Sequence, residues 1–338
     1  MAQRQGGQQP SISQIAAAVG VSPTTVSHAL SGKRAVSART RDRILAEVAR
    51  QNYRPNLVAR GLRRRRTQSI ALVVTDIANP YYPTVARAVH DVLAAAGYVY
   101  FIGNTDGVAE VEQTMVEEMV ARGVDGIIMQ PMALSVARVR ELAGAATPVV
   151  VIADSAGDVP VDQVRTDDAQ GIGEAVRFLV GRGMDRIGYV GGPPAAAPGP
   201  ARLAAFRAAT AAVGVPVPER WIEHTAFTRD GGAAAAERLL ARPDRPRAVL
   251  CANDLIAIGV VGQAQHAGLR VPEDLAVVGF DDIETAGLVT PRLTTVVNPA
   301  TAVGEAVGRT MLARLERGPS GPYERVVLPT RLVVRESA

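Results

Sequence analysis

Residues 11–32 read SISQIAAAVGVSPTTVSHALSG. Ser11 and Gln14 have the spacing of a capping box, in which each side chain satisfies a free backbone N–H of the other residue at a helix start. Ser22 is a second helix-start signal, because Pro23 follows it at the first helical position. Gly20 supplies a stop signal between the two. The pattern predicts two short helices joined by a glycine-containing turn, as in a helix-turn-helix.

The second of these helices should present a small polar face. Val26 and Leu30 have the spacing of an inward stripe. Short polar side chains on a bare helix can approach base edges in a major groove about 12 Å wide. The outward residues are Thr24, Thr25, Ser27 and His28.

A third helix is expected after Ser37, which is a further N-cap signal. Its expected buried stripe consists of Ile44, Leu45, Val48 and Ala49. Any three-helix bundle shares such stripes, so the pattern alone leaves open a small bundle that binds no DNA.

Charge separates this segment from the rest of the chain. Residues 1–66, here called the head, contain Lys33 and twelve arginines against Asp42 and Glu47, for a net charge of +11. The whole chain of 338 residues carries only +4, so residues 67–338, the body, carry −7. A basic head on an acidic body indicates a polyanionic partner for the head alone. The alternative is a solvated basic surface without a partner.

The body alternates between short β-rich runs and alanine-rich helical stretches. Helices are expected at Pro83–Ala96 and Ala109–Arg122, each stopped by a glycine. This alternation predicts parallel sheets covered by helices on both faces, arranged as two Rossmann-like lobes. The expected strands are Ile70–Thr75, Tyr98–Gly103, Gly126–Gln130, Pro148–Ala153, Ile187–Gly191, Ala248–Ala252, Leu275–Phe280 and Leu293–Val297.

Polar and aromatic side chains follow several of these strands, at the end of a parallel sheet where ligands bind. Carboxylates and amides near aromatic rings suit a polyhydroxylated ligand. The alternative is that each Asp or Asn caps the next helix. On the residues alone we favour capping for Asp76, Asp106 and Asp282.

Several functional classes are excluded. No phosphate-binding loop is present, and no nucleophile, base and acid can be grouped, so we expect no enzyme. One cysteine, Cys251, and four histidines without ligand spacing indicate neither a metal nor another cofactor. No apolar run reaches the roughly 18–20 residues of a membrane helix, and no secretory signal is visible. We therefore expect a cytoplasmic protein with no membrane partner.

The sequence resembles the LacI/GalR family of bacterial transcription regulators. The resemblance starts at residues 11–32, continues through residues 36–41, NYRPN at 52–56 and VARGL at 58–62, and extends to LVVRE at 332–336. It implies a periplasmic-binding-protein-like body crossed three times by the chain. The implied domains are a helix-turn-helix at 1–54, a hinge at 55–67 and an effector-binding and dimerisation domain at 68–338. Its N-lobe would cover about 68–165 and 297–325, and its C-lobe about 166–296 and 326–338.

The same resemblance implies roles for individual residues. Leu62 matches a leucine that relatives insert into the minor groove, which kinks the duplex. The implied DNA-binding residues are Ser22, Thr24, Thr25, Ser27, His28, Asn56, Arg60 and Leu62. The implied ligand-binding residues are Asn79, Tyr81, Tyr82, Asp167, Arg202, Phe227, Asn253 and Asp281.

One segment departs from the family pattern. Residues 191–200 read GGPPAAAPGP, where many relatives place polar effector contacts. Small apolar side chains argue against an anionic effector and suggest a loosely closing lid.

The resulting hypothesis is a homodimeric repressor that binds double-stranded operator DNA and responds to a small-molecule effector, a sugar or polyol. One alternative is a DNA-binding regulator without an effector. Another is a solute-binding protein, which the body alone would fit, but which predicts a signal peptide and no basic head.

Overall fold

The structure is a computed structural model that describes residues 10–32, 34–53, 66–153, 159–318 and 321–338. Contacts divide the chain into two compact units, residues 1–67 and 68–338, which are treated separately below. Within the described ranges, no helix is long and apolar enough to cross a membrane.

The first unit is a three-helix bundle whose helices start where the sequence predicted. They are α1 (Ile12–Val19), α2 (Pro23–Ser31) and α3 (Ala38–Arg50). Ser11 and Gln14 form the predicted capping box, and the Ser22 and Ser37 side chains cap the other two helices. Gly20 ends α1 in the left-handed conformation at φ +71°, which glycine adopts without strain. The order of helices and turn is that of a helix-turn-helix.

Fewer residues of α3 contribute to the core of this bundle than expected. Ile15, Val26 and Ile44 are fully buried, and Val48 packs against them. Leu45, by contrast, is 43% exposed, and Ala49 is exposed as well. The prediction of a four-residue stripe on α3 was therefore wrong. α3 packs with one side only, so residues one position further round the helix, about 100° away, face outward.

The second unit contains two sheets, each of six strands among the described residues. The first has the order β11-β5-β4-β3-β1-β2 and the second β12-β10-β9-β8-β6-β7. All neighbours are parallel except β10 and β12. The first sheet comprises β1 (Ser69–Val74), β2 (Val99–Asn104), β3 (Gly126–Met129), β4 (Val149–Ile152), β5 (Asp162–Asp167) and β11 (Arg325–Pro329). The second comprises β6 (Ile187–Gly191), β7 (Ile222–His224), β8 (Ala248–Cys251), β9 (Ala276–Asp281), β10 (Thr294–Val297) and β12 (Arg331–Val333).

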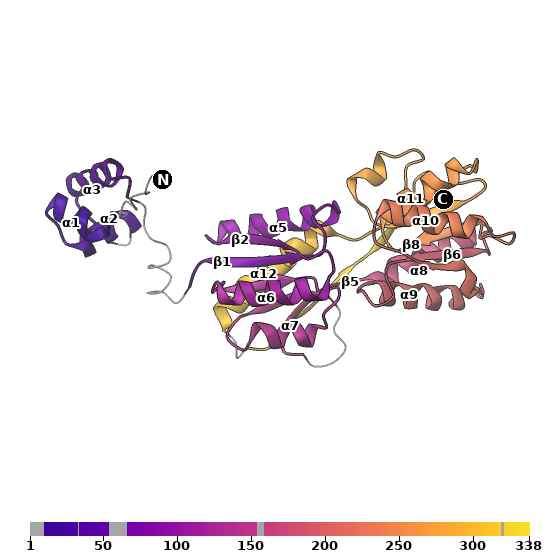
Figure 1. Ribbon diagram of the computed structural model, residues 1–338, viewed down its shortest axis with the longest axis horizontal. Coiled ribbons are helices and arrows are strands. Elements are labelled where there is room, and N and C mark those ends of the chain that lie inside the picture. Colours follow the sequence, from indigo (N-terminus) through magenta and orange to yellow (C-terminus); the bar gives the residue numbers. More distant parts are fainter. Residues whose placement is uncertain (1–9, 33, 54–65, 154–158, 319–320) are drawn as a thin grey trace, which may run out of the picture. The chain divides into compact units, whose positions relative to one another are not determined.

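Helices cover both sheets and define two lobes (Figure 1). The first lobe carries α5 (Tyr81–Ala95), α6 (Ala109–Ala121), α7 (Val136–Ala143) and α12 (Ala300–Arg317). The second lobe carries α8 (Asp168–Gly181), α9 (Gly199–Ala212), α10 (Arg229–Leu240) and α11 (Asp254–His266). Short 3-10 turns occupy Glu219–Trp221 and Glu284–Gly287.

Within the described ranges the chain crosses between the lobes three times: from β5 into α8, from β10 into α12, and from β11 into β12. Thr330, in the third crossing, is 1% exposed. Its hydroxyl donates to the Asp167 carbonyl at 2.6 Å and accepts from the Gly171 N–H at 2.9 Å, so it joins the third crossing to the first. Because β11 pairs with β5, the first sheet reaches Pro329, beyond the expected lobe boundary near residue 325.

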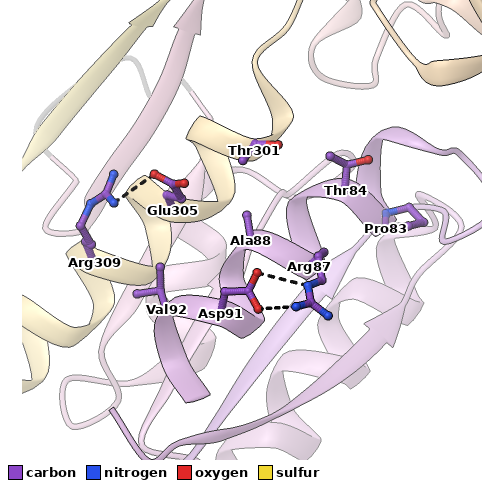
Figure 2. Close-up of a pocket in the computed structure, with 9 residues that line it drawn as sticks. All are labelled: Pro83, Thr84, Arg87, Ala88, Asp91, Val92, Thr301, Glu305 and Arg309. Atoms are coloured by element: carbon purple, nitrogen blue, oxygen red, sulfur yellow. Dashed lines mark hydrogen bonds and ion pairs between the residues drawn. The ribbon is translucent and has the colours of Figure 1, made fainter. Parts of the chain in front are cut away.

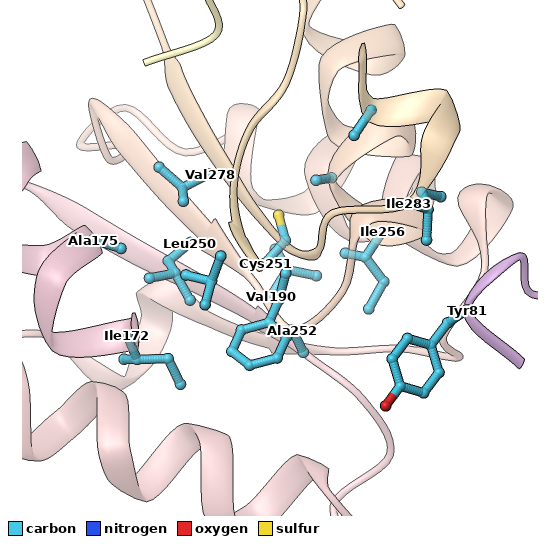
Figure 3. Close-up of a cluster of buried hydrophobic side chains, with 14 of the residues drawn as sticks. Tyr81, Ile172, Ala175, Val190, Leu250, Cys251, Ala252, Ile256, Val278 and Ile283 are labelled. Carbon is cyan, nitrogen blue, oxygen red and sulfur yellow. The ribbon is translucent and has the colours of Figure 1, made fainter. Parts of the chain in front are cut away.

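Both lobes have dense apolar cores built from the inner strands. β1, β3, β4, β8 and β9 are buried along their whole length, as expected for parallel strands covered on both faces. Figure 3 shows part of the second-lobe core, with Ile172 and Ala175 from α8 and Leu250 and Val278 from the sheet. These rigid strands fix the positions of the side chains that follow their carboxyl ends.

Candidate functional site

The predicted DNA-reading face lies on the surface of the head. Thr24 and Ser27 are exposed, and Thr25 and His28 are half-buried. Ser22 is also exposed, but its hydroxyl accepts from the Thr25 N–H at 3.1 Å and so caps α2. The face therefore offers short polar groups to a partner, as the sequence predicted.

Arginines flank this face. Arg34, Arg39 and Arg41 are exposed. Arg43 differs, because its Nη2 donates to the Val19 carbonyl at 2.7 Å and ties α3 to the end of α1. The hinge residues Asn56, Arg60 and Leu62 lie outside the described residues, so their roles remain predictions.

A cavity of about 380 Å³ lies between the two lobes. Seven of the eight predicted ligand residues line it: Asn79, Tyr81, Tyr82, Arg202, Phe227, Asn253 and Asp281. Residues that the sequence interpretation did not assign to a ligand also line it, among them Thr75, Gln130, Met132 and Asn298. The lining residues come from strand ends in both lobes, so one ligand there would contact both.

Arg202 is the only guanidinium among the described lining residues, and the protein already occupies most of its donors. Its Nε donates to Asp168 at 2.7 Å and its Nη1 to the Ala252 carbonyl at 2.6 Å, while Nη2 lies 3.8 Å from Asp281. The group also stacks on Phe280, 3.7 Å from the ring centroid. Burial would lower the pKa of Arg202, but these carboxylates raise it, so the side chain stays charged.

Asp281 faces Arg202 from the end of β9. It adopts φ +114°, a strained conformation for a residue other than glycine. Its Oδ1 accepts a hydrogen bond from Asn298 Nδ2 at 3.0 Å. Burial raises the pKa of Asp281 to about 6, although Arg202 and the Asn298 hydrogen bond both lower it.

Tyr81 and Tyr82 bring aromatic surface and hydroxyl donors from the start of α5. The Tyr81 hydroxyl donates to Asn298 Oδ1 at 3.3 Å, so Asn298 contacts both lobes. Burial raises the pKa of Tyr82 to about 12 and that of Tyr81 further, so both hydroxyls stay protonated at neutral pH. The two rings meet edge to face, with centroids 5.5 Å apart.

Asn253 and Phe227 form one end of the second-lobe wall. Asn253 caps α11 by accepting from the Ile256 N–H at 2.8 Å, and its Nδ2 donates to the Phe227 carbonyl at 3.3 Å. Asn253 therefore both caps a helix and lines the cavity, although the two roles were considered as alternatives. The Phe227 ring lies against Gly192, where a Cβ would overlap it.

Four acidic residues differ from the expectations. Asp167 does not line the cavity, because its carboxylate caps α8 at the Gln170 N–H, and its neighbour Asp168 pairs with Arg202 instead. Asp76 and Asp106 line the cavity, and the capping interpretation was wrong for both, since the N-caps of α5 and α6 are Pro80 and Val108. Asp282 caps no helix either, because it pairs with Arg335 at 2.6 Å.

A larger cavity, of about 600 Å³, lies between α5 and α12 on the first lobe (Figure 2). Its charged groups pair along their own helices: Arg87 with Asp91 at 2.8 Å and Arg309 with Glu305 at 3.1 Å. These exposed pairs leave balanced charges and no convergent set of free polar groups in the described lining. None of the predicted site residues that the structure describes lines this cavity.

Comparisons with known proteins place the chain. The family described as "Bacterial regulatory proteins, lacI family" matches residues 11–56, and a periplasmic binding protein-like domain matches residues 176–338. Catabolite control protein A of Priestia megaterium is 32% identical over 324 residues, which cover 96% of this chain and 97% of that protein. The chain belongs to the LacI family. LacI-family proteins are DNA-binding transcriptional regulators and not enzymes, which confirms the predicted family, fold class and helix-turn-helix head.

Other relatives agree with this assignment. The repressor PurR of Escherichia coli O139:H28 is 32% identical over 333 residues, covering 96% of each chain. Among solved structures, the Lac repressor dimer bound to operator and the anti-inducer ONPF has a TM-score of 0.87 at 24% identity, covering 98% of this chain and 99% of that chain. A complex of the regulator CelR with cellobiose has a TM-score of 0.74 at 29% identity, covering 97% of this chain and 100% of that chain.

Proposed function

We propose that this LacI-family regulator is a cytoplasmic homodimeric repressor whose operator affinity is set by a neutral, hydroxyl-rich effector in the inter-lobe cavity. The observation that carries this proposal is the excess of hydrogen-bond acceptors in the cavity. Asp76, Asp106 and Asp281 oppose one guanidinium, which is already held by Asp168 and Ala252. A ligand must therefore supply donors.

The remaining acceptors support the same ligand class. Among the described residues, none donates to the Gln130 Oε1 atom, although that atom is buried. Neither Asp76 nor Asp106 forms an ion pair with a described residue. A sugar or polyol brings many hydroxyl donors and no negative charge, and its apolar face can stack on Tyr81 or Phe227. A phosphate would meet three carboxylates and no free cation in the described lining, and the cost of its desolvation would not be offset.

The ligands of solved relatives are consistent with this class. CelR was solved with cellobiose, and a LacI-family regulator from Enterococcus faecium, with a TM-score of 0.70 at 29% identity, was solved with ribose. The match to the Enterococcus faecium regulator covers 80% of this chain and 98% of that regulator's chain.

We further propose that two copies pair through the outer edge of the first sheet. β2 is an edge strand on which Val99, Phe101 and Ile102 are 60%, 54% and 48% exposed. An uncovered apolar edge strand promotes association, so a second copy is a suitable cover. On the second lobe, Leu288 is 74% exposed and is a second apolar candidate for the pairing surface.

The proposed mechanism couples the cavity to the hinge by differential binding. Two heads contact the half-sites of a near-palindromic operator with Thr24, Thr25, Ser27 and His28, and the paired hinges insert Leu62 at its centre. An effector that binds one arrangement of the lobes more tightly than the other shifts the population of DNA-competent dimers by that difference in affinity.

Calorimetry of the full chain tests the effector. We expect heat of binding from at least one neutral sugar or polyol, and none from the phosphate ester of the same sugar. Arg202→Ala should abolish both the heat and the effect of the sugar on operator binding but spare operator binding itself. Arg207→Ala, an exposed arginine on the same helix, is the matched control.

The alternative is a LacI-family regulator that responds to no small molecule. The apolar loop at 191–200 favours it, because that loop offers a ligand few side-chain polar groups. A broad panel of neutral sugars, polyols and nucleosides that gives no heat with the folded chain, together with intact operator binding, would support this alternative and refute the proposed effector.

A further inference from the structure

The loop at residues 191–200 reaches the opposite lobe. It runs from the last residue of β6 into the first turn of α9 in the second lobe, and Pro193, Ala196 and Pro198 line the cavity. The Ala197 N–H donates to the Met132 carbonyl at 3.0 Å. Met132 belongs to the first lobe, in the segment between β3 and α7, and also lines the cavity. A backbone hydrogen bond therefore joins the two walls beside the cavity, away from the three chain crossings.

The first-lobe side of this contact is fixed by a buried carboxylate. Glu112 on α6 is 0% exposed. Its Oε1 accepts from the Met132 N–H at 2.8 Å and the Ala133 N–H at 3.2 Å, and its Oε2 accepts from the Leu134 N–H at 2.8 Å. Hydrogen bonds to an ionised acceptor are about twice as strong as neutral ones. The backbone of residues 132–134 is thus held in one orientation.

We propose that the Ala197–Met132 hydrogen bond is a latch that holds the two lobes closed, and that Glu112 is the positioning residue that presents the Met132 carbonyl to it. The proposal concerns the cavity assigned above to the effector, but it depends only on the contact between the lobes. The sequence suggested that the loop at residues 191–200 closes loosely. In the proposal this loop closes on the first lobe through its backbone, so it needs only small side chains. Glu112 needs no contact with a ligand to influence the closed state.

The second-lobe side offers a test that removes a single donor. Ala197→Pro deletes the N–H of the latch, since proline has none. Ala195→Pro is the matched control, because Ala195 is exposed in the same loop and its N–H makes no hydrogen bond with a described residue. The first-lobe side is tested by Glu112→Gln, which replaces one acceptor oxygen with a donor. Glu110→Gln, an exposed position in the first turn of the same helix, is its control.

Lobe separation is measured without any effector by pulsed electron spin resonance on the full chain. Spin labels are placed at two exposed positions, Glu117→Cys on α6 and Asp230→Cys on α10. The chain also contains Cys251, which is buried. Treating the wild-type chain with the spin label shows whether Cys251 reacts. An excess of unlabelled chain ensures that distances arise within one subunit. The unfolding midpoint is followed in parallel by fluorescence of Trp221, the single tryptophan.

We expect Ala197→Pro and Glu112→Gln to shift the main population of label separations, whereas both controls keep the wild-type distribution. Equal distributions for Ala197→Pro and Ala195→Pro would overturn the latch, and equal distributions for Glu112→Gln and Glu110→Gln would overturn the role of Glu112. If Ala197→Pro does not fold, equal distributions for Glu112→Gln and Glu110→Gln overturn the latch as well, because the proposal has Glu112 present the Met132 carbonyl to it. Failure of either result leaves the effector proposal intact, because calorimetry tests that separately.

Discussion

Replacing Asp281 with asparagine should change how the stability of the second lobe depends on pH. The substituted asparagine keeps the size of the side chain, tolerates positive φ better than most residues, and can still accept from Asn298. It removes the titration and the negative charge that faces Arg202. The ordinary pKa of an aspartate is 3.8, and burial raises that of Asp281 to about 6 in the folded chain.

The sign and size follow from the protons bound in each state. Between pH 3.8 and about 6 the folded chain holds a proton on Asp281 that the unfolded chain has lost, so wild-type stability falls as pH rises through this range. Each tenfold difference in proton affinity corresponds to about 1.4 kcal/mol, so the total loss is about 3 kcal/mol. The contribution is fully present below the unfolded pKa and is lost above the folded pKa.

The assay is urea unfolding of the full chain from about pH 4 to about pH 7, read by Trp221 fluorescence. Trp221 is 6% exposed and belongs to the same lobe. The stability of Asp281→Asn relative to wild type should rise by about 3 kcal/mol over this range. Asp254 is buried nearby and remains in both proteins; burial, the larger cause of its raised pKa, is unchanged in the variant, whereas the charge of Asp281 that raises it further is lost. Asp230→Asn, at an exposed site, is the control. If the free energy of unfolding of Asp281→Asn differs from that of wild type by the same amount at every pH, the reasoning is refuted.

Four further predictions concern the head and the packing of the body. Leu62→Ala should weaken specific operator binding without changing effector binding, and unchanged operator affinity by fluorescence anisotropy would contradict the proposed wedge. Operator affinity should fall steeply and linearly on a log–log plot against salt, because counterions are released from neutralised phosphates; a flat plot would argue against phosphate contacts by the head. Gly192→Ala should lower the free energy of unfolding by about 1–3 kcal/mol, since its Cβ overlaps the Phe227 ring, whereas Gly181→Ala, in open space, should not. Asp162→Asn should cost about 3–5 kcal/mol in urea unfolding, because it leaves the buried Arg314 without the carboxylate that its Nε contacts at 2.6 Å; a cost below about 1 kcal/mol would contradict this.

Local signals in the sequence predicted the head well. The Ser11–Gln14 capping box and the caps at Ser22 and Ser37 involve residues within three positions of each other, so sequence spacing determines them. The error on α3 arose because spacing identifies an apolar face but not how wide a neighbour covers it. Leu45 belongs to the apolar face and still lies outside the contact.

The body was predicted in outline, and the strands β5, β7, β11 and β12 were missed. β5, with the sequence DQVRTD, and β11, with RVVLP, carry charged residues and did not stand out as strands. Asp162, the first residue of β5, is nonetheless buried, because Arg314 from the distant α12 pairs with it. A pairing between residues so far apart in the chain leaves no local signal.

The cavity shows the same limit. Residues at or within a few positions of strand ends, such as Asn79, Asn253 and Asp281, were predicted and line it. Asn298 also follows a strand but was overlooked, and only the fold reveals that it joins Tyr81 to Asp281. Asp167 and Asp168 are adjacent, and sequence alone did not distinguish the helix cap from the partner of Arg202.

The hydroxyl of Thr330 has a mechanical consequence. Because it joins the third chain crossing to the first, these two segments cannot shift along each other without losing the hydrogen bonds of Thr330. A rotation of one lobe against the other that keeps both hydrogen bonds must turn about an axis near Thr330. The displacement that such a rotation produces grows with distance from this axis.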